Sequence, residues 1–212
     1  MLRQKKIEIL LLCLTLSLAA CLKLKQPKNK IEYYTLEYDP PVVDNHHPLP
    51  QVIRVQQFSV SPVYNSNRII YRDNSYKRQA YAYHKWRANP ARFVTYYLSR
   101  DLKESGLFKA VLPGDSRIAP AYLVEGSVDD FLERDGENTW EAVLSVSIVF
   151  MDEKQTDISQ KILFQKTYHT SKPCKQKNPR ALAKAMSLAM SEISGNIIHD
   201  LYNYLAARNE EK

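Results

Sequence analysis

The chain has 212 residues, enough for a domain with a sizeable apolar core, and its 30 Lys and Arg against 23 Asp and Glu give a formal net charge of +7. Only Cys174 of the three cysteines lies beyond residue 21, which excludes a fold held together by internal disulfides. Stability must therefore come from a packed core.

The N-terminus has the pattern of a bacterial lipoprotein signal. Its basic residues are Arg3, Lys5 and Lys6. The apolar stretch over residues 9–20 is well short of the ~20 residues that a bilayer-spanning helix needs, and it ends in Leu18-Ala19-Ala20-Cys21. We therefore expect residues 1–20 to be a signal peptide, cleavage between Ala20 and Cys21, and lipid on Cys21.

Two alternatives remain for this segment. One is an uncleaved membrane helix, which Glu8 and the short length disfavour. The other is an ordinary secretory signal in which Cys21 is incidental. In either cleaved form the chain is exported, so we expect no nucleic-acid partner.

Residues 21–30 are predicted to form a lipidated basic tether. Its lysines are Lys23, Lys25, Lys28 and Lys30. Such residues each contribute about 1 kcal/mol near an anionic membrane surface. At ~3.3 Å per residue, the tether can hold the domain at most about 30 Å from the membrane.

The first half of the domain is predicted to hold four strands and then a helix. The strands are residues 32–38, 51–60 with a bulge near Gln56 and Gln57, 68–72 and 78–85, and residues 39–50 form a proline-rich loop. Asn89-Pro90 predicts a helix start and Gly106 its end. Apolar residues between them fall on one helical face.

The second half has the same order. Strands are expected at residues 122–134, 140–152 and 161–170, with a hairpin around Asp135-Gly136, and Asn178-Pro179 opens a second helix. A structural duplication and chance explain this order equally well. The sequence predicts one α+β domain over residues 31–206, a largely antiparallel sheet covered by two amphipathic helices, and a charged tail at 207–212.

Short motifs resemble those of a known family in order and spacing. They are Cys21, Tyr33-Tyr34-Thr35-Leu36, Ile53-Arg54-Val55, Arg68-Ile69-Ile70-Tyr71-Arg72, Tyr83-His84-Lys85-Trp86 before Asn89-Pro90, and Gly106-Leu107-Phe108. In them the chain resembles ABC-type transport auxiliary lipoproteins, over residues 30–206. It departs from that pattern at Arg87 and in the tyrosine-rich residues 76–83.

The resemblance implies a non-catalytic periplasmic lipoprotein that serves an MCE-type lipid transport system. The implied partners are an MCE-domain protein and an ABC permease and ATPase, and a homo-oligomeric ring is a further implied property. Leu22 is not the aspartate that commonly retains lipoproteins at the inner membrane, so outer-membrane residence facing the periplasm is expected.

Residues 68–87 combine aromatic and cationic side chains. The predicted partner surface consists of Tyr71, Arg72, Tyr81, Tyr83 and Trp86. Tyrosine, tryptophan and arginine are enriched at interface hot spots because they bury large areas with few rotatable bonds. The alternative is a sheet whose tyrosines alternate between core and solvent.

No catalytic motif or cofactor-binding glycine loop occurs, so we expect neither enzyme activity nor a cofactor. Asp44, His46 and His47 would make a poor metal chelate, so no metal is expected. Asp129, Asp130 and Glu133 are predicted to be a solvated strand edge and His84, His169 and His199 ordinary surface or boundary residues. An alternative function is an envelope assembly or regulatory lipoprotein, such as a cell-wall synthase activator or an outer-membrane protein chaperone.

Overall fold

The computed structural model describes residues 30–43, 47–73 and 75–210. The folded unit begins at Ile31 and contains a nine-stranded sheet. Its strands are β1 Glu32–Tyr34, β2 Leu49–Val55, β3 Ser59–Val60, β4 Arg68–Arg72, β5 Gln79–Trp86, β6 Phe108–Leu112, β7 Tyr122–Asp135, β8 Trp140–Asp152 and β9 Ile162–Pro173. Its helices are the short 3-10 turn η1 Pro62–Tyr64, and α2 Pro90–Glu104, α3 Ile158–Lys161 and α4 Pro179–Glu210.

The sheet is mixed, so the prediction of a largely antiparallel sheet is wrong. The β7–β8, β8–β9 and β4–β5 pairs are antiparallel, as the hairpin signals indicated. The strands β2, β3 and β4 instead lie one after another along the other edge of β7, all parallel to it. Edge pairs β1–β5 and β2–β6 are parallel as well. The two halves of the sequence therefore share one sheet.

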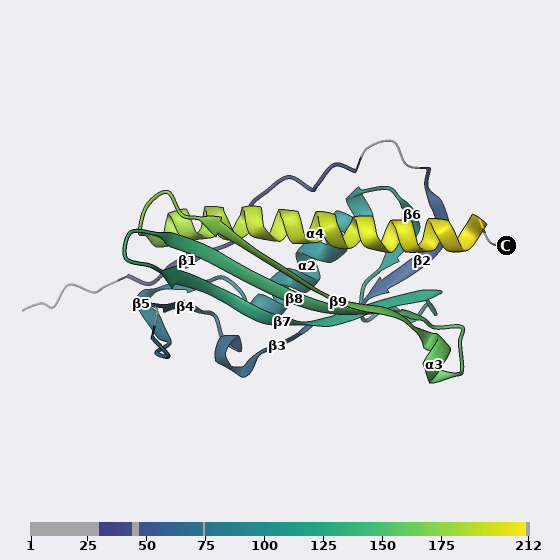
Figure 1. The fold of residues 1–212 in the computed structure, drawn as a ribbon, viewed down its shortest axis with the longest axis horizontal. Coiled ribbons are helices and arrows are strands. Elements are labelled where there is room, and N and C mark those ends of the chain that lie inside the picture. The colour runs from purple at the N-terminus through teal and green to yellow at the C-terminus, as the bar shows by residue number, and fades with distance from the viewer. Residues whose placement is uncertain (1–29, 44–46, 74, 211–212) are drawn as a thin grey trace, which may run out of the picture. The chain divides into compact units, whose positions relative to one another are not determined.

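The core lies between this sheet and the helices. Five apolar residues of β8 are completely buried on the helix side: Ala142, Leu144, Val146, Ile148 and Phe150. Helix α4 crosses β8 and β9 and also packs against α2 (Figure 1). The apolar alternation in the sequence thus identified the correct face of β8.

Helix α2 forms as its end signals predict. The Asn89 side chain accepts a hydrogen bond from the Ala91 N–H at 2.9 Å, and Pro90 takes the first helical position. Gly106, just past the helix, has a φ of 66°, which glycine adopts at little cost. Phe93, Val94, Leu98 and Leu102 are buried, as the predicted apolar face requires.

Helix α4 begins at Pro179 with Asn178 accepting from the Ala181 N–H at 2.8 Å. It continues to Glu210, so most of the predicted tail is helical, and Arg208 forms an ion pair with Asp152 at 3.0 Å. Short α3 and β6 were not predicted. The described residues contain three α-helices, whereas two were predicted. The sequence did not reveal α3 or β6 because elements of four or five residues are too short to show a periodic pattern of apolar residues.

Candidate interaction surface

All five residues predicted to form a partner surface lie on two neighbouring strands, but only four of them lie toward the surface. Tyr71 and Arg72 end β4, while Tyr81 and Tyr83 lie on β5. The rings of Tyr71 and Tyr81 are 5.2 Å apart, and both side chains are half-buried. Tyr83 is 47% exposed. The structure thus brings Tyr71 and Tyr81 together and leaves Tyr83 accessible to a partner.

Trp86 does not belong to this surface, and that part of the prediction is wrong. Its side chain is 1% exposed. The rings of Phe93 and Phe131 lie edge-on to it, with centroids 6.1 and 5.2 Å away. Edge-to-face contacts of this kind stabilise apolar cores. The last residue of β5 therefore anchors the sheet to α2 instead of contacting a partner.

A buried carboxyl group lies beneath the tyrosines of the surface. The Tyr81 hydroxyl donates to both oxygens of Glu133, at 3.0 and 3.2 Å. Glu133 is 1% exposed, and burial together with the nearby Asp135 raises its pKa to about 7. Asp135 itself forms an ion pair with Lys177 at 2.7 Å. The prediction of a solvated edge is wrong for Glu133.

The remaining acidic candidates have separate partners. Asp130 accepts a hydrogen bond from the Tyr64 hydroxyl at 2.9 Å. Asp129 accepts from Ser147 at 2.5 Å on the neighbouring strand. Two carboxylates with different structural partners do not make an acid–base pair.

Cys174 is a buried thiol directly after β9. Burial, followed by the negative charge of Glu133, raises its pKa to about 11. Because the thiolate is the nucleophilic form, this thiol is unreactive.

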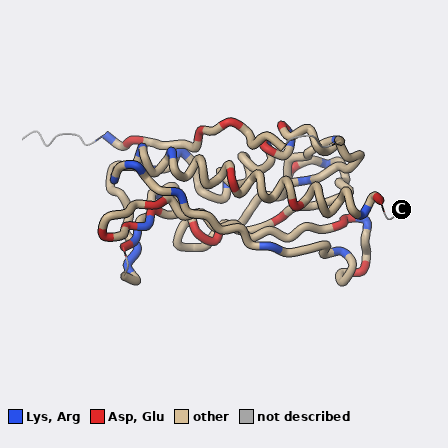
Figure 2. The backbone as a smooth tube through the Cα atoms, turned by 45° about the horizontal axis from the view of Figure 1, so that its top comes forward, with Lys and Arg blue, Asp and Glu red and all other residues tan. Residues whose placement is uncertain are grey.

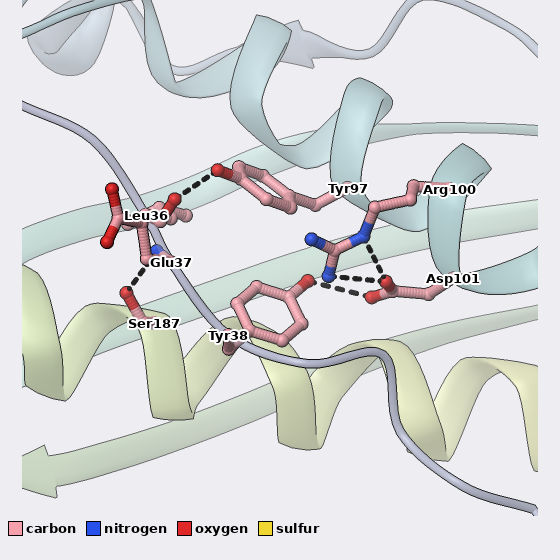
Figure 3. Close-up of polar contacts among 7 residues, drawn as sticks. All are labelled: Leu36, Glu37, Tyr38, Tyr97, Arg100, Asp101 and Ser187. Carbon is pink, nitrogen blue, oxygen red and sulfur yellow. Dashed lines mark hydrogen bonds and ion pairs between the residues drawn. The ribbon is translucent and has the colours of Figure 1, made fainter. Parts of the chain in front are cut away.

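Residues 35–39, here called the strap, run across α2 and α4 (Figure 3). The predicted strand over 32–38 ends at Tyr34, because the following backbone bonds to helices instead of to a strand. The Glu37 N–H donates to the Ser187 hydroxyl at 2.9 Å, and the Tyr97 hydroxyl donates to the Leu36 carbonyl. Leu36 itself is buried.

A charged pair on α2 completes this attachment. The Tyr38 hydroxyl donates to Asp101 at 2.7 Å, and Arg100 binds the other carboxylate oxygen at 2.8 Å (Figure 3). The Arg100 guanidinium stacks on the rings of Tyr38 and Tyr97, 4.4 and 4.7 Å from their centroids. Burial and the charge of Asp101 raise the pKa of Tyr38. The sequence analysis did not identify Asp101, although an acidic residue on the apolar face of α2 indicates a buried hydrogen-bonding partner.

Several predicted residues lie outside the described ranges. They are Ala20 and Cys21 of the cleavage and lipidation site, and Asp44 and His46 of the proline-rich loop. Among the described residues, no three His, Cys, Asp or Glu side chains are grouped to hold a metal ion. No described helix is both long and apolar enough to cross a membrane.

The family described as the ABC-type transport auxiliary lipoprotein component matches residues 34–198. The chain belongs to this family. The match runs from the last residue of β1 through most of α4, so it spans the strap, strands β2 to β9 and α2. Members of the ABC-type transport auxiliary lipoprotein family are described as lipoprotein components of transport systems.

Solved structures share the fold of this auxiliary lipoprotein. A Xanthomonas campestris protein of the DUF330 family is 15% identical with a TM-score of 0.75, covering 85% of this chain and 99% of its own. A hypothetical protein from Chlamydia trachomatis is 10% identical with a TM-score of 0.54, covering 75% of this chain and 99% of its own. At these identities the likeness concerns the fold alone. No curated protein matches the chain.

Proposed function

We propose that the protein is a non-catalytic accessory lipoprotein of an MCE-type ABC lipid transport system, anchored through Cys21 in the outer membrane and facing the periplasm. The observation that carries the proposal is the family match over residues 34–198, which includes the strap, α2 and most of α4. Two features of the sequence support it: the Leu18-to-Cys21 signal and Leu22 in place of an aspartate.

The anchor is tested by Cys21→Ser in the full-length precursor. The variant should incorporate no labelled fatty acid and should move from the membrane to the soluble envelope fraction, because two or three acyl chains hold a protein far more firmly than a folded surface does. Labelling and density fractionation measure both effects. Unchanged membrane fractionation with no label would contradict the anchor, and wild-type protein in the inner-membrane fraction would contradict the sorting.

The partner is tested by crosslinking in envelopes followed by co-purification. Recovery of an MCE-domain protein with its permease and ATPase supports the proposal. Recovery of a cell-wall synthase or an outer-membrane protein in their place would favour the assembly or regulatory alternative. The homo-oligomeric ring stays a prediction, which the mass of the purified complex tests.

The surface on β4 and β5 supplies the matching mutation. Tyr83→Ala combined with Arg72→Ala should weaken capture of the MCE-domain protein about tenfold or more, because exposed aromatic and arginine side chains dominate interface energies. Tyr96→Ala is the control, since Tyr96 is 63% exposed on α2, away from β4 and β5. Equal capture by the folded double variant and the control would place the interface elsewhere.

A further inference from the structure

A hollow of about 620 Å³ lies between the start of the chain's folded part and the start of α4. Tyr34 and His84 line it from β1 and β5, and Lys175, Arg180 and Lys184 line it from the segment that begins α4. We call this hollow the β1–α4 groove. It brings together three cations that are separated from Tyr34 by about two-thirds of the sequence.

The cations of the β1–α4 groove are available to a ligand. Lys175, Arg180 and Lys184 are all exposed, and none of them forms an ion pair with another described residue. They differ in this from the neighbouring Lys177, which forms an ion pair with Asp135. The groove cations therefore keep their full attraction for an anion.

Two acidic residues lie nearby. Glu32 accepts a hydrogen bond from the Tyr34 hydroxyl at 2.7 Å, and its carboxylate lies 3.4 Å from His84. Glu37, on the strap, borders the neighbouring hollow that also contains Arg180 and Lys184. The three groove cations, Lys175, Arg180 and Lys184, outnumber these two carboxylates. Figure 2 shows lysine and arginine positions on several segments at the end of the fold where the chain enters the described part.

The position of the groove along the chain identifies its occupant. Lys30 precedes Tyr34, the first residue that lines the groove, by four residues, so at most about 14 Å of extended backbone separates the two. From Lys30 back to Cys21 the chain can extend at most about 30 Å, and the acyl chains end it in a bilayer. A cationic surface on so short a tether meets anionic lipid headgroups before any other abundant anion.

From this geometry we infer that the β1–α4 groove binds the anionic phospholipid headgroups of the membrane that carries the anchor. The inference rests on the proposed lipidation of Cys21. Lysine and arginine supply the charge, and Tyr34 with His84 supplies an aromatic wall of the kind that lies well at headgroup depth. Binding there orients the domain, with the β1 end toward the lipid and β6 and α3 away from it.

The test uses the mature chain with Cys21→Ser, so that binding comes from the protein surface alone. Co-sedimentation with phosphatidylcholine vesicles, with and without phosphatidylglycerol, measures affinity. We expect binding only to the phosphatidylglycerol vesicles, and weaker binding as salt is added. The groove variant is Lys175→Ala, Arg180→Ala and Lys184→Ala. Each cation contributes about a fivefold gain near an anionic surface, so this variant should bind roughly a hundredfold more weakly.

Two matched variants separate the groove from charge in general. Lys109→Ala, Arg117→Ala and Lys154→Ala removes three exposed cations that lie away from the groove and should bind as the parent does. Lys175→Arg, Arg180→Lys and Lys184→Arg keeps the groove charge and should also bind as the parent does. Thermal unfolding checks that every variant folds.

Equal loss of vesicle binding in the groove and control variants would overturn the inference, as would no loss in either. Normal vesicle binding by a groove variant that no longer crosslinks to an envelope protein would also overturn it and make the groove a protein interface. Failure of the anchor itself is seen separately, as loss of fatty-acid labelling in the wild-type precursor.

Discussion

Glu133 shows how the surroundings of a single residue decide its chemistry. It belongs to a run of acidic residues on β7 whose sequence suggests solvent, yet it is 1% exposed and bonded to Tyr81. The sequence could not predict this burial, because Tyr81 reaches Glu133 from a strand that pairs with β4, not with β7. The sequence also could not show that Trp86 is buried, because a tryptophan is equally suited to a core and to an interface.

The raised pKa of Glu133 predicts how stability depends on pH. Between the ordinary value of 4.5 and about 7, the folded state keeps the proton that the unfolded state has lost. The free energy of unfolding should therefore fall as pH rises through this window, by roughly 3 kcal/mol at most, and then level off. Glu133→Gln should remove this part of the decline, which denaturant titrations at a series of pH values measure.

Glu137→Gln is the control for this prediction. It removes a carboxylate from the same hairpin, but Glu137 is exposed, so the variant should keep the wild-type decline with pH. Parallel pH profiles for the wild type and Glu133→Gln would show that the carboxyl group ionises normally in the fold.

Helix ends and turns that depend only on neighbouring residues were predicted correctly from the sequence. Helix α2 begins at Asn89-Pro90 and ends before Gly106, as predicted. The turn at Asp135-Gly136 joins β7 and β8. The strap did not follow, because its conformation is set by helices that occur much later in the chain. Its Tyr97 and Ser187 contacts satisfy backbone groups that a strand would have satisfied with a neighbour.

The strap predicts a local stability effect. Tyr38→Phe removes a hydrogen bond to the buried Asp101 carboxylate while keeping the ring on which Arg100 stacks. The free energy of unfolding should fall by about 2 kcal/mol, the usual contribution of a hydrogen bond to a charged group. Tyr96→Phe, on the exposed side of α2, should change it little. Equal denaturation midpoints for the two variants would contradict a role of Tyr38 in holding the strap.

For the whole molecule, strand direction was the property hidden from the sequence. The segments at residues 51–60 and 68–72 were correctly predicted as extended, but nothing local indicates that they follow one edge of β7 in the same direction. The predicted partner surface was found in part: Tyr71, Arg72, Tyr81 and Tyr83 lie together on β4 and β5. The β1–α4 groove could not be foreseen, because Tyr34 and Arg180 meet only through the tertiary fold.

The placement of β1 at the sheet edge has a mechanical consequence. Tension on a tether at residue 30 would enter the domain at this three-residue strand, which pairs with β5 and with no other strand among the described residues. Under a pulling force, the hydrogen bonds of β1 should open first and those of the strap next, because local unfolding begins where few contacts oppose it. The long β7–β8 hairpin would stay folded, so the residues of β1 and the strap would extend the tether while the core remains intact.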